Sequence, residues 1–598
     1  MFVERRRVAF TGQLFARVGI VWLLVCVLLL ATNATAILAG RFPDPDDSLR
    51  LIQVRDLLAG QGWFDLTQHR IDAAHGGVPM HWSRLVDVPL AGMMLVLAPL
   101  LGPALAETVT VIAVPLITFG IALLLVGRIA WRLIGPQAAT LACLVLAMSV
   151  PVVGQLRPLR IDHHGWQIVL ALVALNALMA RSARRGGWIA GLGLAAWLAI
   201  SLEGLPMAAA FAGIAALRWL RNPAERGWLI HLMQGLALGS IALFAATRGL
   251  GDLADHCDTV APIHLAVFGW GAMVLTALGR VRALPLVPTL LGFALAGGWG
   301  LAFVLVAAPQ CAGGTFDMID PVVRRFWYDN VTEGLPVWRQ DASTALQTVL
   351  PPLIALGSTL KLAARSQDWL RRWWQDYAML LAAALALAVL VARAGAVAGA
   401  LAAVPLGWQL GQWLAAGRLQ VILPRRLATL AAVILALLPA LPITLFTLAA
   451  PLRAGSVTSP ETAFAATAPR ASSCRIPEAA VTLRALPRGD ILAPLDIGPR
   501  LLLETRHGVV ATGHHRAAPA MRAVIDAFTG TPEQARAIVS ERGLDYVAIC
   551  PDLAEPAVYV GYAPHGLAAQ LRQGEAPDWL KQVAMPVGVD LKVWRVAR

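Results

Sequence analysis

Long apolar runs recur from about residue 14 to residue 449 and then stop. A helix needs roughly 20 apolar residues to cross a bilayer, and most of these runs approach that length. The pattern predicts about 13 spans, at 14–39, 106–131, 137–154, 164–180, 187–201, 204–218, 227–247, 263–279, 284–307, 345–360, 376–392, 396–415 and 427–449. Two of them, 187–201 and 204–218, are short enough to form one broken hairpin. We expect a polytopic α-helical membrane domain over residues 1–449.

Basic residues fall in the short connections between these runs. The clusters are Arg5–Arg7, Arg128/Arg132, Arg181/Arg184/Arg185, Arg218/Arg221/Arg226, Arg280/Arg282, Lys361/Arg365/Arg371/Arg372 and Arg418/Arg425/Arg426. Only 14% of the 598 residues are charged, 58% are hydrophobic, and the formal net charge is +13. In a membrane protein such an excess marks cytoplasmic loops, so the charge gives no support to a nucleic-acid partner. Placing every cluster inside predicts a cytoplasmic amino end and a carboxyl-terminal domain outside.

Two apolar stretches need separate interpretation. Residues 85–101 are apolar enough to span, but counting them would move the next arginine cluster to the wrong side, so we expect a helix along or dipping into the membrane. The arginines at 5–7 before the first run resemble a signal peptide. A run of about 26 residues without a small-residue cleavage site favours a retained helix instead.

From about residue 450 the pattern changes to short alternating runs. Strands are predicted at 490–494, 500–504, 508–512, 545–550 and 591–596, with helices at 518–528 and 532–542. This mixture indicates a small α/β domain over 450–598. His514 and His515, between a predicted strand and helix, either face an acceptor or form a loop cluster.

Four of the six cysteines fall outside the predicted spans. Cys257–Cys311 and Cys474–Cys550 are the simplest of three possible pairings, and free thiols are the alternative. Disulfides favour an oxidising compartment such as the periplasm, which indicates a bacterial inner membrane protein.

The first long external loop, 40–105, opens on an acidic cluster. Asp44, Asp46 and Asp47 precede Arg50 just outside a predicted span. Such carboxylates repel one another unless a cation or an arginine compensates them, and a hard divalent cation prefers oxygen ligands. The alternative is a solvated turn in which Asp46 or Asp47 caps the next helix.

A second external loop combines bases, an acid and two histidines before the predicted span 164–180. Its polar residues are Arg157, Arg160, Asp162, His163, His164 and Gln167. Charged groups at the edge of hydrocarbon are costly and therefore suggest a functional site. The alternative is interfacial anchoring, with Asp162 starting or capping the helix.

A third element lies in the external loop 308–344. Arg324, Arg325, Trp327 and Tyr328 precede a lone Glu333. The alternative is an aromatic belt at the membrane interface, which has a similar composition.

Together the three elements resemble the catalytic subunit of archaeal and bacterial oligosaccharyltransferases, of the GT-C glycosyltransferase superfamily. Asp44-Pro45 through Arg50 is similar to the family's Asp-Pro-x-x-x-x-Arg pattern, and Asp162-His163-His164 to its Asp-x-Asp/Glu/His motif. Asn330-Val331-Thr332-Glu333 resembles its Thr/Ser-Ile/Val-x-Glu motif, with Asn in the first position.

The resemblance implies the roles of these residues. Asp44, Asp162 and His164 would ligate Mg²⁺ or Mn²⁺, and Glu333 would complete or adjoin that site. Arg393, in a late apolar stretch, would face the leaving phosphate or pyrophosphate of a polyprenyl-linked sugar donor, with a snorkelling arginine as the alternative. Remaining site candidates are Arg50, Arg157 and Arg160 for the donor, and Asp46, Asp47, His163, Gln167, Trp327 and Tyr328.

The acceptor is less clearly indicated. The family reads an Asn-x-Ser/Thr acceptor with a Trp-Trp-Asp motif, which this chain lacks; Trp373-Trp374-Gln375-Asp376 falls in a predicted cytoplasmic loop. We therefore expect an extracytoplasmic acceptor other than an asparagine sequon. The competing hypotheses are an oligosaccharyltransferase acting on protein, a lipid or polysaccharide transporter, and a non-catalytic scaffold.

Overall fold

The computed structural model describes residues 11–449 and 474–597, except 255, 282–283, 312, 315 and 317–318. The basic residues at 5–7 and Arg282 lie outside this part of the chain. The chain divides into two compact units. We call them the helical unit, residues 1–41, 82–315 and 332–451, and the sheet unit, residues 42–81, 316–331 and 452–598.

Every apolar run predicted as a span is helical in the helical unit. Its α-helices are α1 Gly12–Thr32, α2 Ala34–Leu38, α4 Arg84–Leu101, α5 Pro103–Leu133, α6 Pro136–Met148, α7 Val150–Gly154, α8 His164–Ala177, α9 Ala183–Ile200, α10 Leu205–Arg221, α11 Gly227–Thr247, α12 Pro262–Arg280, α13 Leu286–Ala307, α15 Ala342–Ala364, α16 Asp368–Leu390, α17 Gly395–Leu419, α18 Leu423–Leu437 and α19 Leu441–Ala449. Within the described residues, nine helices are long and apolar enough to cross a membrane. The chain is a membrane protein, whereas the count of 13 spans stays a prediction.

One of those nine helices is α4, the stretch expected to lie along the membrane. Its 18 residues meet the length and hydropathy of a span. Its placement relative to a bilayer stays a prediction.

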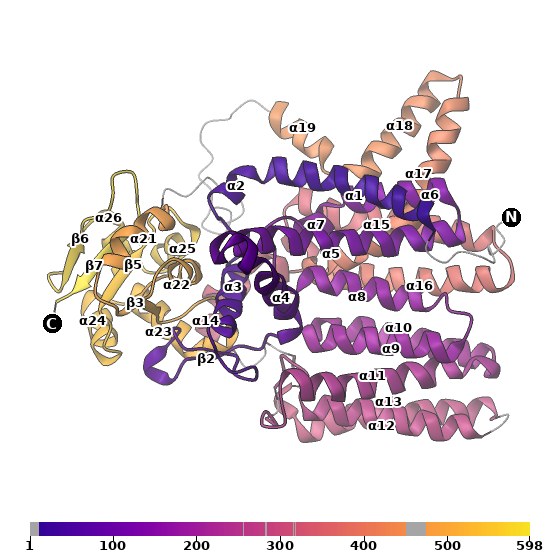
Figure 1. The fold of residues 1–598 in the computed structure, drawn as a ribbon, viewed down its shortest axis with the longest axis horizontal. Helices are drawn as coiled ribbons and strands as arrows, with labels where there is room; N and C mark the ends of the chain where they lie inside the picture. The colour runs from indigo at the N-terminus through magenta and orange to yellow at the C-terminus, as the bar shows by residue number, and fades with distance from the viewer. Residues whose placement is uncertain are drawn as a thin grey trace. The chain divides into compact units, whose positions relative to one another are not determined.

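Several helices that follow one another in sequence pack side by side, as α4 and α5, α8 and α9, and α12 and α13 do, and α9 also packs on α11 (Figure 1). The contact between α9 and α11 depends on Gly191 and Gly235. A Cβ at Gly191 would overlap the carbonyl oxygen of Leu232, and one at Gly235 would lie 2.9 Å from that of Trp188. Small residues let helix backbones approach in lipid, so this glycine-lined contact suits a membrane bundle.

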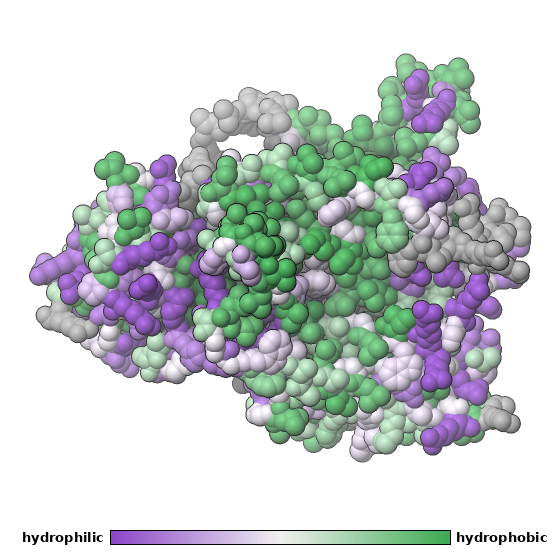
Figure 2. Space-filling view, in the orientation of Figure 1, coloured by the Kyte–Doolittle hydropathy of each residue, from purple (hydrophilic) through white to green (hydrophobic). Residues whose placement is uncertain are grey.

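The helical unit has one arginine-rich end. Arg181 lies in the α8–α9 connection and Arg226 in the α10–α11 connection. Because α8 to α11 alternate in direction, these connections share one end, and the α9–α10 connection and the start of α8 share the other (Figure 1). Figure 2 shows hydrophobic residues over the helix sides and hydrophilic residues at the arginine-bearing end.

The sheet unit contains a five-stranded sheet with the order β4-β3-β5-β7-β6. The strands are β3 Asp490–Leu492, β4 Gly508–Val509, β5 Tyr546–Ile549, β6 Leu580–Val583 and β7 Lys592–Val596. β3 pairs in parallel with β4 and β5, and β7 pairs antiparallel with β5 and β6. The α-helices that follow residue 474 are α21 Ile476–Ala485, α22 Gly498–Glu504, α23 Ala518–Thr529, α24 Pro532–Glu541, α25 Ala554–Tyr562 and α26 Leu567–Gln573.

One predicted strand of this unit is wrong. Residues 500–504 belong to α22, a helix that starts at Gly498 with Pro499 in its first turn. Proline there presets the helical φ and loses no hydrogen bond. A short apolar run such as this one does not distinguish a strand from a helix by periodicity.

Two segments from earlier in the chain complete the sheet unit. They carry α3 Pro45–Leu58, β1 Thr67–Gln68, β2 Val78–Pro79 and α14 Pro321–Phe326. The Arg70 guanidinium donates to the carbonyl oxygens of Leu502 and Thr505 at 2.9 and 3.0 Å. Ile71 forms a parallel bridge with Val509, the last residue of β4. Much of the first external loop therefore packs as part of this unit.

Both predicted disulfides are present. Cys257 and Cys311 pair in the helical unit with Cα atoms 5.2 Å apart, and Cys474 and Cys550 pair in the sheet unit at 5.8 Å. The predicted pairing is confirmed.

Candidate active site

A buried carboxylate between two imidazoles lies just before α8, at the end of the helical unit opposite the arginine connections. Asp162 Oδ1 lies 2.5 Å from His163 Nδ1, and Asp162 Oδ2 lies 2.8 Å from His164 Nδ1. Burial alone raises the pKa of Asp162, but the charge and hydrogen bonds of His163 and His164 outweigh it and hold that pKa well below its ordinary value. Asp162 is therefore ionised, and it fixes both rings.

The backbone before α8 positions Asp162 and the two histidines. Leu159 has a φ of 69°, in the left-handed region, and its amide donates to the carbonyl oxygen of Val111 in α5 at 3.0 Å. The residue at the N-cap of α8 is His163, and Asp162 precedes it. The structure thus uses the Asp162 carboxylate to hold imidazoles.

A carboxylate and two guanidinium groups lie beside the histidine pair. Glu333 Oε1 is 3.6 Å from an Arg393 nitrogen, and Glu333 Oε2 is 4.0 Å from an Arg160 nitrogen. The Leu335 carbonyl oxygen accepts from the Ala392 amide at 3.1 Å, which ties the chain after Glu333 to the α16–α17 connection. Arg160 also donates to Gln155 at 3.0 Å.

Sequence reasoning missed Glu203, which belongs to the same cluster. It lies in the α9–α10 connection, and its Oε1 is 2.6 Å from Arg393 Nη2. Gln167 donates to Glu203 at 3.4 Å and accepts from Trp197 at 3.0 Å. The sequence signal that could have identified Glu203 is its position as a lone glutamate between two apolar runs.

Other predicted site residues lie in the sheet unit. Asp44 is the N-cap of α3, and its Oδ1 accepts from the Asp46 amide at 2.9 Å. The alternative in which Asp46 or Asp47 caps the helix is therefore wrong, because Pro45 opens the helix and leaves the capping position to the residue before it. Asp47 is buried in the first turn.

The remaining candidates are spread over both units. In the sheet unit, Arg50 is fully buried in α3, and Trp327 and Tyr328 follow α14. The Arg324 guanidinium lies 5.2 Å from the Tyr328 ring centre. Arg157 is half-buried in the loop before Asp162. Convergence of Asp44 with Asp162 and His164 stays a prediction, since Asp44 belongs to the other unit.

The histidine pair fits a metal ion on one structural test. His164 Nε2 is buried and has no hydrogen-bond partner among the described residues, while its Nδ1 is held by Asp162. Metal-ligating histidines characteristically have their other nitrogen fixed by a carboxylate. Asp162, His163 and His164 also offer ligand atoms within 4.8 Å of one another. A mixed set of nitrogen and oxygen donors suits Mn²⁺ better than Mg²⁺.

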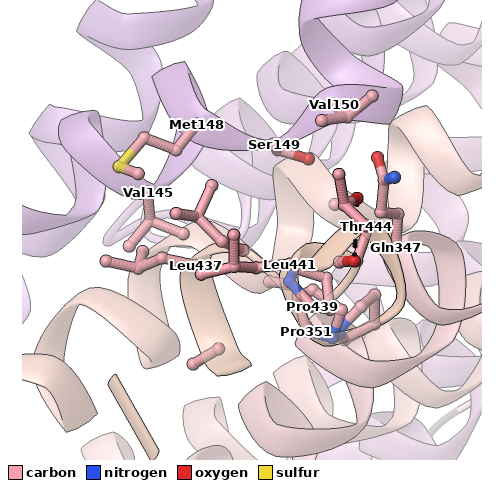
Figure 3. Close-up of a pocket in the computed structure, with 16 residues that line it drawn as sticks. Val145, Met148, Ser149, Val150, Gln347, Pro351, Leu437, Pro439, Leu441 and Thr444 are labelled. Atoms are coloured by element: carbon pink, nitrogen blue, oxygen red, sulfur yellow. Dashed lines mark hydrogen bonds between the residues drawn. The ribbon is translucent and has the colours of Figure 1, made fainter. Parts of the chain in front are cut away.

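The helical unit also contains an apolar pocket of about 210 Å³ between α6, α7, α15, α17 and the helices that follow. Figure 3 shows Gln347 and Thr444 on one side of it and Val145 and Leu437 on the other. Apolar lining with a few polar groups is typical of a ligand pocket.

Trp373-Trp374-Gln375-Asp376 has a structural role. Trp373 and Trp374 are buried in α16, and Asp376 pairs with Arg218 at 2.6 Å and Arg221 at 3.4 Å. This segment lies near the arginine-rich end, away from the histidine pair.

Comparison with known proteins gives the class of fold. No protein-family model and no curated protein matches the chain. Solved structures show that it has the fold of an archaeal oligosaccharyltransferase.

Similar structures include those of oligosaccharyltransferase from Archaeoglobus fulgidus, among them the archaeal enzyme AglB. The complex with an inhibitory peptide and a dolichol-phosphate has a TM-score of 0.61 at 14% identity, covering 98% of this chain and 75% of that one. The apo form has a TM-score of 0.63 at 12% identity, covering 95% and 73%. A complex with Zn and sulfate has a TM-score of 0.58 at 13% identity, covering 92% and 70%. At these identities the similarity concerns the fold.

Proposed function

We propose that this chain is a glycosyltransferase that moves a sugar or oligosaccharide from a polyprenyl-phosphate or polyprenyl-pyrophosphate donor to an acceptor outside the cytoplasm. The observation that carries the proposal is the Asp162–His164 pair beside Glu333 and Arg393. Its setting is a bacterial inner membrane with the amino end in the cytoplasm and residues 450–598 in the periplasm.

Arginines at the site suit the donor. Breaking a sugar–phosphate bond builds negative charge on the leaving phosphate, and preorganised cations stabilise that charge. Arg160 pairs with Glu333, and Arg393 pairs with both Glu333 and Glu203. These carboxylates hold the guanidinium groups in place. A divalent ion held by His164, with Asp162 behind it and Glu333 nearby, would supply further charge stabilisation.

Glu333 is the group available to an acceptor. Its side chain is 35% exposed, so a substrate can reach its carboxylate. General-base assistance is more useful for a hydroxyl than for an unreactive amide, and the Trp-Trp-Asp reader of a sequon is missing. We propose a lipid or glycan hydroxyl as the acceptor.

The apolar pocket suits the donor's isoprenoid tail. AglB has been solved with a dolichol-phosphate, which is a polyprenyl lipid. In this chain the pocket offers Val145, Met148 and Leu437 to such a tail, with Gln347 and Thr444 as polar groups at its side.

The test is transfer of a labelled sugar from polyprenyl-linked donors by the purified protein. Glu333→Gln should slow transfer about 10²–10⁴-fold, the usual contribution of general acid–base catalysis. Donor affinity should be unchanged, because Glu203 still holds Arg393 and Gln155 still accepts from Arg160. Glu225→Gln, near the arginine-rich end, is the matched control and should retain full activity. Unimpaired transfer by Glu333→Gln would remove Glu333 from the mechanism. Efficient transfer to an Asn-x-Thr peptide would instead establish a protein acceptor.

A further inference from the structure

Three histidines from two distant segments meet in the sheet unit. His81 follows β2, and His514 and His515 follow β4. His81 Nδ1 lies 2.9 Å from His514 Nε2, and each of the three histidines offers a ring nitrogen within 4.8 Å of the other two. His514 is buried, whereas His81 and His515 are half-buried. We propose that these three imidazoles bind a transition-metal ion of the zinc type, at a site separate from His164.

The arrangement of the rings supports this. Their centroids form a nearly equilateral triangle with sides of 5.0, 4.9 and 4.9 Å. With zinc–nitrogen bonds of about 2.0–2.1 Å and about 1.1 Å from each nitrogen to its ring centre, tetrahedral geometry puts the centroids about 5 Å apart. The same geometry puts the ligand nitrogens about 3.3 Å apart. The hydrogen-bonded pair His81 Nδ1 and His514 Nε2, at 2.9 Å, is within a few tenths of an ångström of that value, and the other two pairs lie within 4.8 Å.

The donor set selects the ion. All three donors are imidazole nitrogens, which suit Zn²⁺, Cu²⁺ and Ni²⁺ and not Mg²⁺ or Ca²⁺. Three protein ligands leave a fourth tetrahedral position for water or an anionic oxygen. Partial exposure of His81 and His515 gives such a ligand access from solvent.

The segments that carry the histidines are held independently of any metal. The amide of Met80 donates to the Leu66 carbonyl oxygen at 3.1 Å, which fixes the chain next to His81. The amide of Ala517 donates to the His514 carbonyl oxygen at 2.8 Å. Phe316 packs edge-on against the His515 ring, with centroids 5.2 Å apart. A preformed triad of this kind binds an ion without having to be ordered first.

The test uses the full-length protein without a histidine tag, stripped with a chelator and dialysed. Zn²⁺ content after re-equilibration is measured by elemental analysis, and Co²⁺ serves as the spectroscopic probe. Wild type should bind one more equivalent of Zn²⁺ than the His514→Gln/His515→Gln variant. Its Co²⁺ form should show the strong visible absorption of a tetrahedral ion, which the variant lacks.

Controls separate this site from folding and from the proposed transferase. His565→Gln, an exposed histidine in the same unit, should retain the Zn²⁺ equivalent, and the double substitution should remove one equivalent from a His164→Gln background as well. The double variant in EDTA should match the unfolding temperature of metal-free wild type, which shows that only the site is lost. Equal Zn²⁺ content in wild type and the double variant would overturn the proposal whether or not the protein transfers sugar.

Discussion

Replacing Asp162 by Asn tests whether this carboxylate acts through His164. The amide keeps the shape of the side chain but offers one acceptor oxygen where Asp162 offers two, one to each imidazole. One ring then either loses a hydrogen bond to a charged group, about 1.5–3 kcal/mol, or changes tautomer to accept from the amide. If the ring that changes is His164, its proton moves to Nε2, which can then no longer bind a cation.

The expected effect is therefore on metal dependence. Loss of a carboxylate behind a metal-ligating histidine typically costs 10–100-fold in metal affinity or activity, about 1.4–2.7 kcal/mol. We expect Asp162→Asn to raise the Mn²⁺ concentration for half-maximal sugar transfer by that factor, with partial rescue by excess Mn²⁺. Asp368→Asn, an exposed residue whose φ of 48° asparagine tolerates, is the matched control. A wild-type Mn²⁺ profile for Asp162→Asn would refute the reasoning.

Three further results are expected. A reporter fused after Asn222, in the α10–α11 connection, should show cytoplasm and one fused to the carboxyl end should show periplasm; the reverse pattern would overturn the predicted topology. The Cys474→Ala/Cys550→Ala variant should unfold at lower temperature in calorimetry, because a link between residues 76 apart contributes up to about 4.5 kcal/mol in the chain-entropy model; an unchanged transition would contradict this. Burial, with the neighbouring charge of Asp496, raises the pKa of Glu555 to about 8, above an unfolded value of about 4.3. The stability that the protonated Glu555 carboxyl contributes to the sheet unit is complete below pH 4.3 and is lost as the pH rises through 8. Glu555→Gln should therefore flatten the pH dependence of the free energy of unfolding of this unit, and an unaltered slope would contradict the prediction.

Local sequence was sufficient for the features whose signal is local. Apolar runs of spanning length predicted the helices, because a segment in lipid must satisfy its backbone internally. Asp162 and His164 were found because their spacing places them at one helix start. The pairing of Cys257 with Cys311 followed from their order along the chain.

Features that depend on distant contacts were not predicted. Glu203 has no local pattern, and only folding brings it to Arg393. The apolar run at 500–504 was assigned to a strand because its hydrophobicity fits either element, and the helix is stabilised by what surrounds it. The attachment of residues 42–81 to the sheet unit rests on contacts such as that between Arg70 and Leu502, which no short window of sequence contains.

The contact between Arg70 and Leu502 also sets the time that the first external loop spends without its partner during synthesis. Arg70 and the Leu502 carbonyl oxygen are 432 residues apart in the chain. At about 5–20 residues per second, the loop is made roughly 20–90 s before its partner strand and helix exist. Throughout that interval the acidic cluster and the residues that bridge to β4 lack their native contacts. We therefore expect the loop to depend on chaperones and to be open to proteolysis during that interval, on whichever side of the membrane it lies.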